Sequence, residues 1–131
     1  MDLEKVFKNL IVGQGILSVI LVIAELNMPS KYYEINEMIQ SEVSLSEAYI
    51  LISLIFLIAI FVSLVLLYRY VSFGKKFYVI VFIVGTILQL LGGAYVFHAF
   101  SLTIITIHAV FTGATLTLLF FSPIKNKFIK D

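Results

Sequence analysis

The sequence contains no cysteine and no tryptophan, only two prolines, and few charged residues. Without cysteine, the chain has no disulfide, no thiolate metal ligand and no cysteine nucleophile. Charged residues make up 13% of the chain and hydrophobic residues 61%, a balance that excludes an ordinary soluble domain and also a disordered chain. The net charge of +1 argues against general nucleic-acid binding. The class that is left is an integral membrane protein.

The scarcity of charges also locates the membrane spans. The three longest stretches without a charged residue are 9–24, 48–68 and 77–124, which hold 16, 21 and 48 residues. A spanning helix needs roughly 20 apolar residues. As one helix the third stretch would measure about 72 Å, more than twice the hydrocarbon thickness of a bilayer, so it must fold back once. We place this turn at residues 98–101, because Ser101 can cap a new helix.

The sequence therefore predicts an all-α integral membrane protein with one membrane domain over residues 1–131, built as a bundle of four transmembrane helices. The expected spans are residues 6–26, 46–70, 76–98 and 102–122, and the expected external loop is 27–45. Apolar residues recur at helical spacing within this loop, at Tyr32, Ile35, Met38 and Ile39. We expect a short amphipathic helix there, which either only connects the first two spans or serves as a recognition cap.

The basic residues predict the orientation of the bundle. Eight of the nine fall at one end, and Lys31 is the exception. By the positive-inside rule both termini are expected to be cytoplasmic, in a multipass protein of the inner membrane. The seven tyrosines map near the predicted membrane surfaces, where an apolar ring with a polar hydroxyl is stable. Tyr78 is accordingly interpreted as part of this interfacial belt.

Polar side chains inside the spans are the candidate functional residues, because polar groups are costly in hydrocarbon. The candidate cluster consists of Gln14, Gln89, His108, Thr112 and Thr115. Thr112 and Thr115 follow His108 at helical spacing, so the three share one helix face. Three interpretations are open: hydrogen bonds that hold helices together, a substrate path lined by the amides, and a ligand-contacting or proton-handling role for His108.

Small residues spaced four apart allow two helices to approach closely. Gly85 and Gly93 flank Gln89 in a G-x-x-x-Q-x-x-x-G pattern, and Gly113 follows Ala109 in a second small-residue pair. The predicted helix-packing glycines are Gly85, Gly92, Gly93 and Gly113. We expect the third and fourth spans to form the tightest packing face.

Glu25 and His98 lie at the expected outer mouth of the bundle, where they could form a weak, exposed pair. With two histidines, no cysteine and dispersed carboxylates we expect no metal site. His98 and His108 lie at different depths, which argues against a haem with two histidine ligands. Hydrolase and phosphate-binding motifs are also missing from the sequence. We therefore expect no cofactor and no enzymatic activity.

The expected function is that of a small multipass inner-membrane protein that acts without catalysis, by binding a membrane partner or itself within the lipid bilayer. One specific hypothesis is immunity-type protection against a membrane-targeting toxin, suggested by compact spans, short loops and missing catalytic motifs. The alternative is a small transporter or apolar-ligand-binding protein with an outward-facing pocket near His108. A third hypothesis is an accessory subunit of a larger membrane complex.

Overall fold

The computed structural model describes residues 2–40, 47–91 and 96–128, without the side chains of residues 40, 47–50, 89 and 91. Its elements are α1 (Leu3–Leu26), α2 (Ser30–Gln40), α3 (Glu47–Tyr68), α4 (Ser72–Leu91), α5 (Ala99–Phe121) and the 3₁₀ helix η1 (Pro123–Phe128). Within these described residues there are helices and no strands. Three helices are long and apolar enough to cross a membrane, namely α1, α3 from Leu51 onward, and α5. The prediction of an all-helical membrane protein is confirmed in this form.

Local sequence signals explain where several helices begin and end. The Asp2 side chain caps α1, because its Oδ1 accepts hydrogen bonds from the backbone N–H groups of Glu4 and Lys5 at 3.0 and 3.3 Å. Helix α5 ends at Phe121, and Ser122 and Pro123 follow it. Proline has no backbone N–H, so Pro123 cannot continue the hydrogen bonds of the helix.

The helix α4 differs from the expected third span, since it runs from Ser72 to Leu91 and not over residues 76–98. Helix α5 in turn begins earlier than expected. Its N-cap is His98, whose Nδ1 accepts from the backbone N–H of Phe100 at 3.3 Å. Ser101, the cap that the sequence suggested, is buried inside α5.

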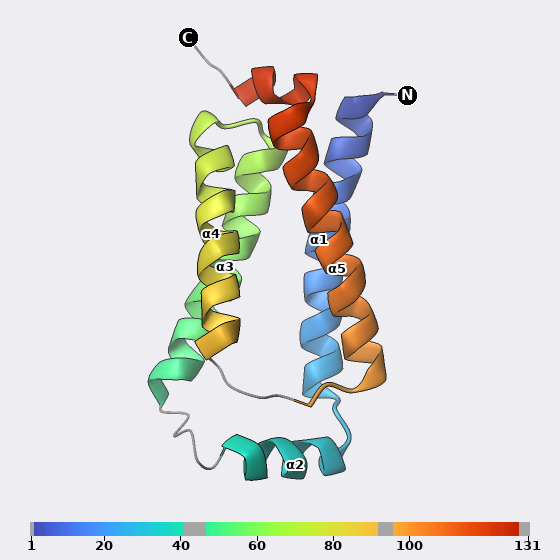
Figure 1. Cartoon of the computed structure of the whole chain (residues 1–131), viewed down its shortest axis with the longest axis vertical. Coiled ribbons are helices and arrows are strands. Elements are labelled where there is room, and N and C mark those ends of the chain that lie inside the picture. Colours follow the sequence, from blue (N-terminus) through green and yellow to red (C-terminus); the bar gives the residue numbers. More distant parts are fainter. Residues whose placement is uncertain (1, 41–46, 92–95, 129–131) are drawn as a thin grey trace.

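The long helices form two antiparallel pairs, as Figure 1 shows: α1 lies against α5, and α3 lies against α4. The pairs meet mainly through α1 and α3, while η1 packs on α5 and α4. A tight turn joins α3 to α4. In this turn Tyr70 has a φ of 54°, and Gly74 lies so close to Leu66 that a Cβ would stand 2.9 Å from the Leu66 backbone carbon.

The hydrophobic core lies at the end of the bundle where α1 begins and η1 ends. Phe7, Leu67 and Leu119 are completely buried there. Tyr70 stacks on Phe7 at a centroid distance of 5.8 Å, and Phe128 meets both rings edge-on. Toward the other end the pairs contribute less to a common core, since residues 51–62 of α3 include no buried side chain.

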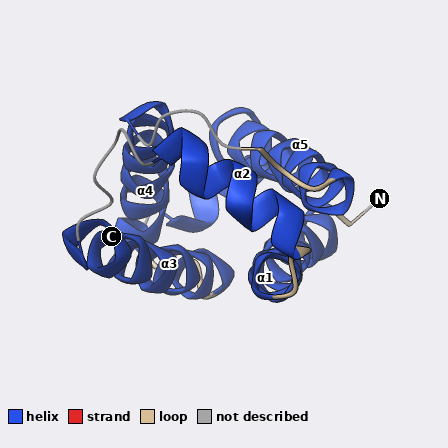
Figure 2. Cartoon of the chain, turned by 90° about the horizontal axis from the view of Figure 1, so that it is seen from below, coloured by secondary structure: helices blue, strands red, loops and turns tan. Residues whose placement is uncertain are grey.

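Helix α2 crosses the opposite end of the bundle, as the view from below in Figure 2 shows. It is attached through Asn36, which is 5% exposed. The Asn36 side chain donates to the carbonyl oxygen of Val96 at 3.1 Å and accepts from the Val96 N–H at 2.7 Å. These two bonds connect α2 to the segment just before α5.

Candidate functional site

A polar cluster lies between α1, α4 and α5, and Gln14 is at its centre. Gln14 is 1% exposed, so every polar atom of its amide needs a partner inside the protein. Its Nε2 donates to Thr115 Oγ1 at 2.6 Å and contacts the carbonyl oxygen of Phe111 at 3.5 Å. Its Oε1 accepts from the hydroxyl of Tyr78 at 2.7 Å. The amide is therefore satisfied by two helices other than its own.

Tyr78 brings α4 into this cluster, which the sequence did not predict. The interpretation as an interfacial tyrosine is corrected by its burial, since Tyr78 is 5% exposed and its hydroxyl reaches Gln14. No local signal distinguishes it from the other tyrosines. Tyr78 follows the basic pair Lys75 and Lys76 closely, and such a position is typical of a residue at the membrane surface.

His108 forms the second half of the cluster, together with Ser18 and Thr112. The Ser18 hydroxyl donates to the carbonyl oxygen of Gln14 at 2.9 Å and lies 3.3 Å from His108 Nε2. Because the single Ser18 proton is used on that carbonyl, the contact is a hydrogen bond when His108 carries a proton on Nε2 and donates it to Ser18. The Thr112 hydroxyl donates to the His108 carbonyl oxygen at 2.9 Å, on the same side of α5.

Four of the five residues of the predicted cluster are thus close together. Gln14 contacts Thr115, and through Ser18 and Thr112 it is linked to His108. The fifth, Gln89, lies in α4, and its side chain is outside the described part of the structure. Ser18 and Tyr78 complete the group. Chemically the cluster offers an amide, hydroxyls and one imidazole, and their hydrogen bonds are directed at one another.

The predicted packing glycines differ in their surroundings. Gly85 packs directly against the ring of Phe56 in α3, so it does allow a close contact between α3 and α4. Gly92 and Gly93 lie outside the described residues. A Cβ at Gly113 would meet no described atom within 4 Å, so this glycine makes no close helix contact within the described chain. Close approach of α1 and α5 occurs instead at Gly13, against the ring of Phe111.

The two residues of the predicted outer mouth lie near α2. His98 meets Tyr32 edge-on, with ring centroids 5.3 Å apart, and caps α5 as described above. Glu25 lies in the last turn of α1. The structure thus gives His98 a role in capping and packing.

The opposite end of the bundle holds the ion pairs of the described residues. Glu4 pairs with Lys8 at 3.1 Å and with Lys127 from η1, which brings the two ends of the described chain together. Tyr70 lies beside this group. Burial, and after it the negative charge of Glu4, raises the pKa of Tyr70 to about 12.

Cavities of the described structure include one at the basic end of the bundle and one between two of the long helices. The larger, of about 990 Å³, lies between α4 and the α5–η1 region, and the smaller, of about 300 Å³, lies between α1 and α3. His108 lines neither of them. Comparison of the chain with protein-family models, with curated proteins and with solved structures finds no match.

Proposed function

We propose that this chain is a four-span inner-membrane protein that acts without catalysis, by binding a partner helix within the bilayer, and that the partner is a second copy of itself. Helix α4 serves as the fourth span. Its described residues after the lysine pair, 77–91, carry no charge and correspond to about 22 Å of helix, most of the thickness of the hydrocarbon core, and α4 pairs with the apolar α3. Both termini are then on the cytoplasmic side, because the basic residues gather at that end.

The observation that carries this proposal is a stripe of small residues on the outward face of α5. The small-residue stripe consists of Thr106, Ala109, Gly113 and Thr117. All four are exposed. Three of them point away from the buried Thr112 and Thr115, and Ala109, three positions before Thr112, forms the edge of the stripe. Within a membrane, faces of small residues are typical of helix–helix contacts because they let two backbones approach.

The stripe suits a protein neighbour for a second reason. The Thr106 and Thr117 hydroxyls donate to carbonyl oxygens of their own helix at 2.9 Å each, so they need no outside hydrogen-bond partner. Gly113 leaves an open space beside the helix that lipid chains fill less closely than another helix would. The same stripe on a second copy is complementary to it, as a two-fold symmetric interface requires.

The internal polar cluster supports a function without catalysis. Its groups are directed at one another, as the bonds of Gln14 with Thr115 and Tyr78 show. A reactive centre would instead aim a nucleophile or base at a substrate position. We interpret the cluster as the hydrogen bonds that hold α1, α4 and α5 together.

The proposal is tested by the mass of the protein in a mild detergent, measured by light scattering with the detergent contribution subtracted. The wild type is expected to be a dimer. Gly113→Leu fills the stripe and should give a monomer with unchanged helix content. The matched control is Ser53→Leu, which adds similar bulk to an exposed position of α3 and should leave the dimer intact. A monomeric wild type, or equal loss of the dimer in both variants, would contradict the proposal.

The two more specific hypotheses remain predictions. Immunity-type protection is one form that binding within the membrane could take, and challenge of an expressing strain with membrane-targeting toxins tests it. The transporter alternative requires a ligand pocket near His108. Since the ring nitrogens of His108 contact the hydroxyls of Ser18 and Thr112 within the cluster, we give the alternative second place.

A further inference from the structure

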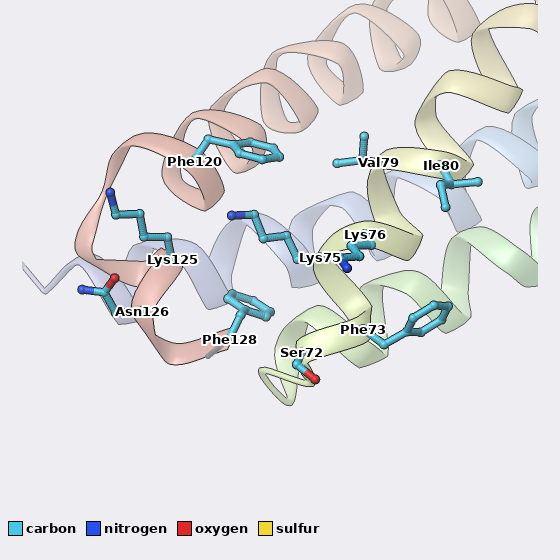
Figure 3. A pocket seen from close by; sticks show the side chains of 10 residues that line it. All are labelled: Ser72, Phe73, Lys75, Lys76, Val79, Ile80, Phe120, Lys125, Asn126 and Phe128. Carbon is cyan, nitrogen blue, oxygen red and sulfur yellow. The ribbon is translucent and has the colours of Figure 1, made fainter. Parts of the chain in front are cut away.

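The larger cavity lies at the end of the molecule that holds the first turn of α4, the last turn of α5, and η1. Figure 3 shows the side chains around it, with α4 on one side and α5 and η1 on the other. The residues that matter here are Lys75, Lys76, Val79 and Ile80 of α4, Phe120 of α5 and Lys125 of η1. The cavity lies where the two helix pairs face each other, since α4 packs mainly on α3 and α5 mainly on α1.

We propose that this cavity binds an anionic phospholipid of the surrounding bilayer. The site is separate from the helix contact proposed for Gly113 and does not depend on it. The first argument is the order of residues along each wall. In α4, Ser72 and Phe73 begin the wall at the end of the bundle and the two lysines follow. Val79 and Ile80 lie one turn further into the bundle than Lys75 and Lys76, which is about 6 Å. Each wall element therefore has its cationic group toward the end of the bundle.

The opposite wall has the same order in the reverse chain direction. Phe120 lies in the last turn of α5, and Lys125 follows after the helix has ended. Both walls thus become apolar toward the middle of the bundle. This gradient matches a phospholipid, whose charged headgroup lies at the surface while its acyl chains extend into the hydrocarbon. A soluble anion would use only the lysines, and a purely apolar ligand would leave them without a counter-charge.

The second argument is the charge of the site. None of the ten described residues that line the cavity is acidic. The ion pairs of the described residues both use Glu4, with Lys8 and Lys127 as partners, so they do not involve the lysines of the cavity. The ammonium group of Lys75 lies 4.3 Å from the centroid of the Phe120 ring, across the cavity. A phosphate would add the negative charge that the site lacks.

The third argument is the side of the membrane. The cavity lies at the basic end of the bundle, which the positive-inside rule assigns to the cytoplasm. Anionic lipids give that leaflet its negative surface, and basic pockets between transmembrane helices on that side bind their headgroups. The position of the cavity therefore exposes it to the leaflet where its ligand is available.

The experiment is native mass spectrometry of the detergent-solubilised protein with phosphatidylglycerol and phosphatidylcholine that carry identical acyl chains. The test variant is Lys75→Gln/Lys125→Gln, with one change on each wall. The control is Lys5→Gln/Arg69→Gln, which removes the same charge from exposed positions at the same end. We expect the wild type to retain phosphatidylglycerol preferentially. The test variant should lose about five-fold in affinity for each lysine, roughly 25-fold in total, while the control keeps its affinity.

Glycerol phosphate without acyl chains serves as a competitor, and it should not displace the bound lipid. Displacement would overturn the proposal in favour of a soluble anion. Equal retention of the two phospholipids, or equal losses in the test and control variants, would also overturn it. Gly113→Leu should retain phosphatidylglycerol like the wild type, so failure of the dimer proposal and failure of this one give different results. Circular dichroism checks that all variants keep their helix content.

Discussion

The hydroxyl of Tyr78 in α4 donates a 2.7 Å hydrogen bond to the side-chain oxygen of Gln14 in α1. This bond joins a helix of one antiparallel pair to a helix of the other. Since the same Gln14 amide donates to Thr115 of α5, one buried side chain connects three helices. In hydrocarbon, where water cannot replace a lost partner, such a connection helps to specify how the helices pack.

Tyr78→Phe should therefore destabilise the protein while leaving its helices intact. The substitution removes the donor to a buried acceptor, and we expect a loss of about 1 kcal/mol in the free energy of unfolding. Thermal or denaturant unfolding in detergent measures it. Tyr33→Phe is the control, because Tyr33 is exposed on α2 and should tolerate the change. Equal stability of the two variants would show that the Tyr78–Gln14 bond does not hold the pairs together.

Two glycines offer a second, matched comparison. A Cβ at Gly74 would lie 2.8 Å from Leu66 Cβ and 2.9 Å from its backbone carbon, whereas a Cβ at Gly113 would meet no described atom. Gly74→Ala should cost about 1–3 kcal/mol, because the backbone of α3 cannot move away easily. Gly113→Ala should leave the stability of the single chain unchanged or raise it slightly, since alanine favours helix. The free energies of unfolding of the two variants are compared at a high ratio of detergent to protein, so that the single chain is measured. A larger loss of stability in Gly113→Ala than in Gly74→Ala would contradict this prediction.

The turn between α3 and α4 predicts a dependence of stability on alkaline pH. Burial raises the pKa of Tyr70 from 10.0 to about 12, so the folded protein binds this proton more tightly than the unfolded chain. The resulting stabilisation is fully present below pH 10 and is lost as the pH rises toward about 12. The difference in stability between the wild type and Tyr70→Phe should shrink over this range. A constant difference would mean that Tyr70 titrates normally.

The orientation of the chain can be tested because it has no cysteine of its own. A single cysteine at Lys5, in the first turns of α1, should react with a membrane-impermeant maleimide only after the cells are permeabilised. A single cysteine at Lys31, in α2, should react in cells whose inner membrane is intact. The opposite pattern would reverse the proposed topology. Labelling of both positions from one side would contradict the single membrane crossing by α1 that separates Lys5 from Lys31.

Composition and helical spacing were enough to predict an all-helical membrane protein and to select Gln14, His108, Thr112 and Thr115 as polar residues within the helices. The partners of these residues were harder to predict. Thr115 lies 101 positions from Gln14 in the sequence, and the identity of the amide alone does not say which hydroxyl it meets. The contact of Tyr78 with Gln14 also joins residues far apart in the sequence. In addition, the local sequence of Tyr78 resembles that of a tyrosine at the membrane surface.

The glycines show why packing could not be predicted from spacing alone. Gly85 and Gly113 both belong to small-residue patterns, but Gly85 packs against Phe56 whereas Gly113 faces outward. The pattern indicates that a close approach is sterically allowed, and only the arrangement of the helices decides which face is used.

The central claim, that two copies meet through the outward face of α5, is tested most directly by disulfide formation in native membranes. Single cysteines are placed in turn at Thr106, Ala109, Gly113 and Thr117. The controls are Ile107 and Leu118, which lie on another face of α5. Oxidation should give crosslinked dimers at the four stripe positions and far less at the two controls, with the periodicity of one helix face. Crosslinking that is equal at all six positions, or absent at the stripe, would contradict the claim.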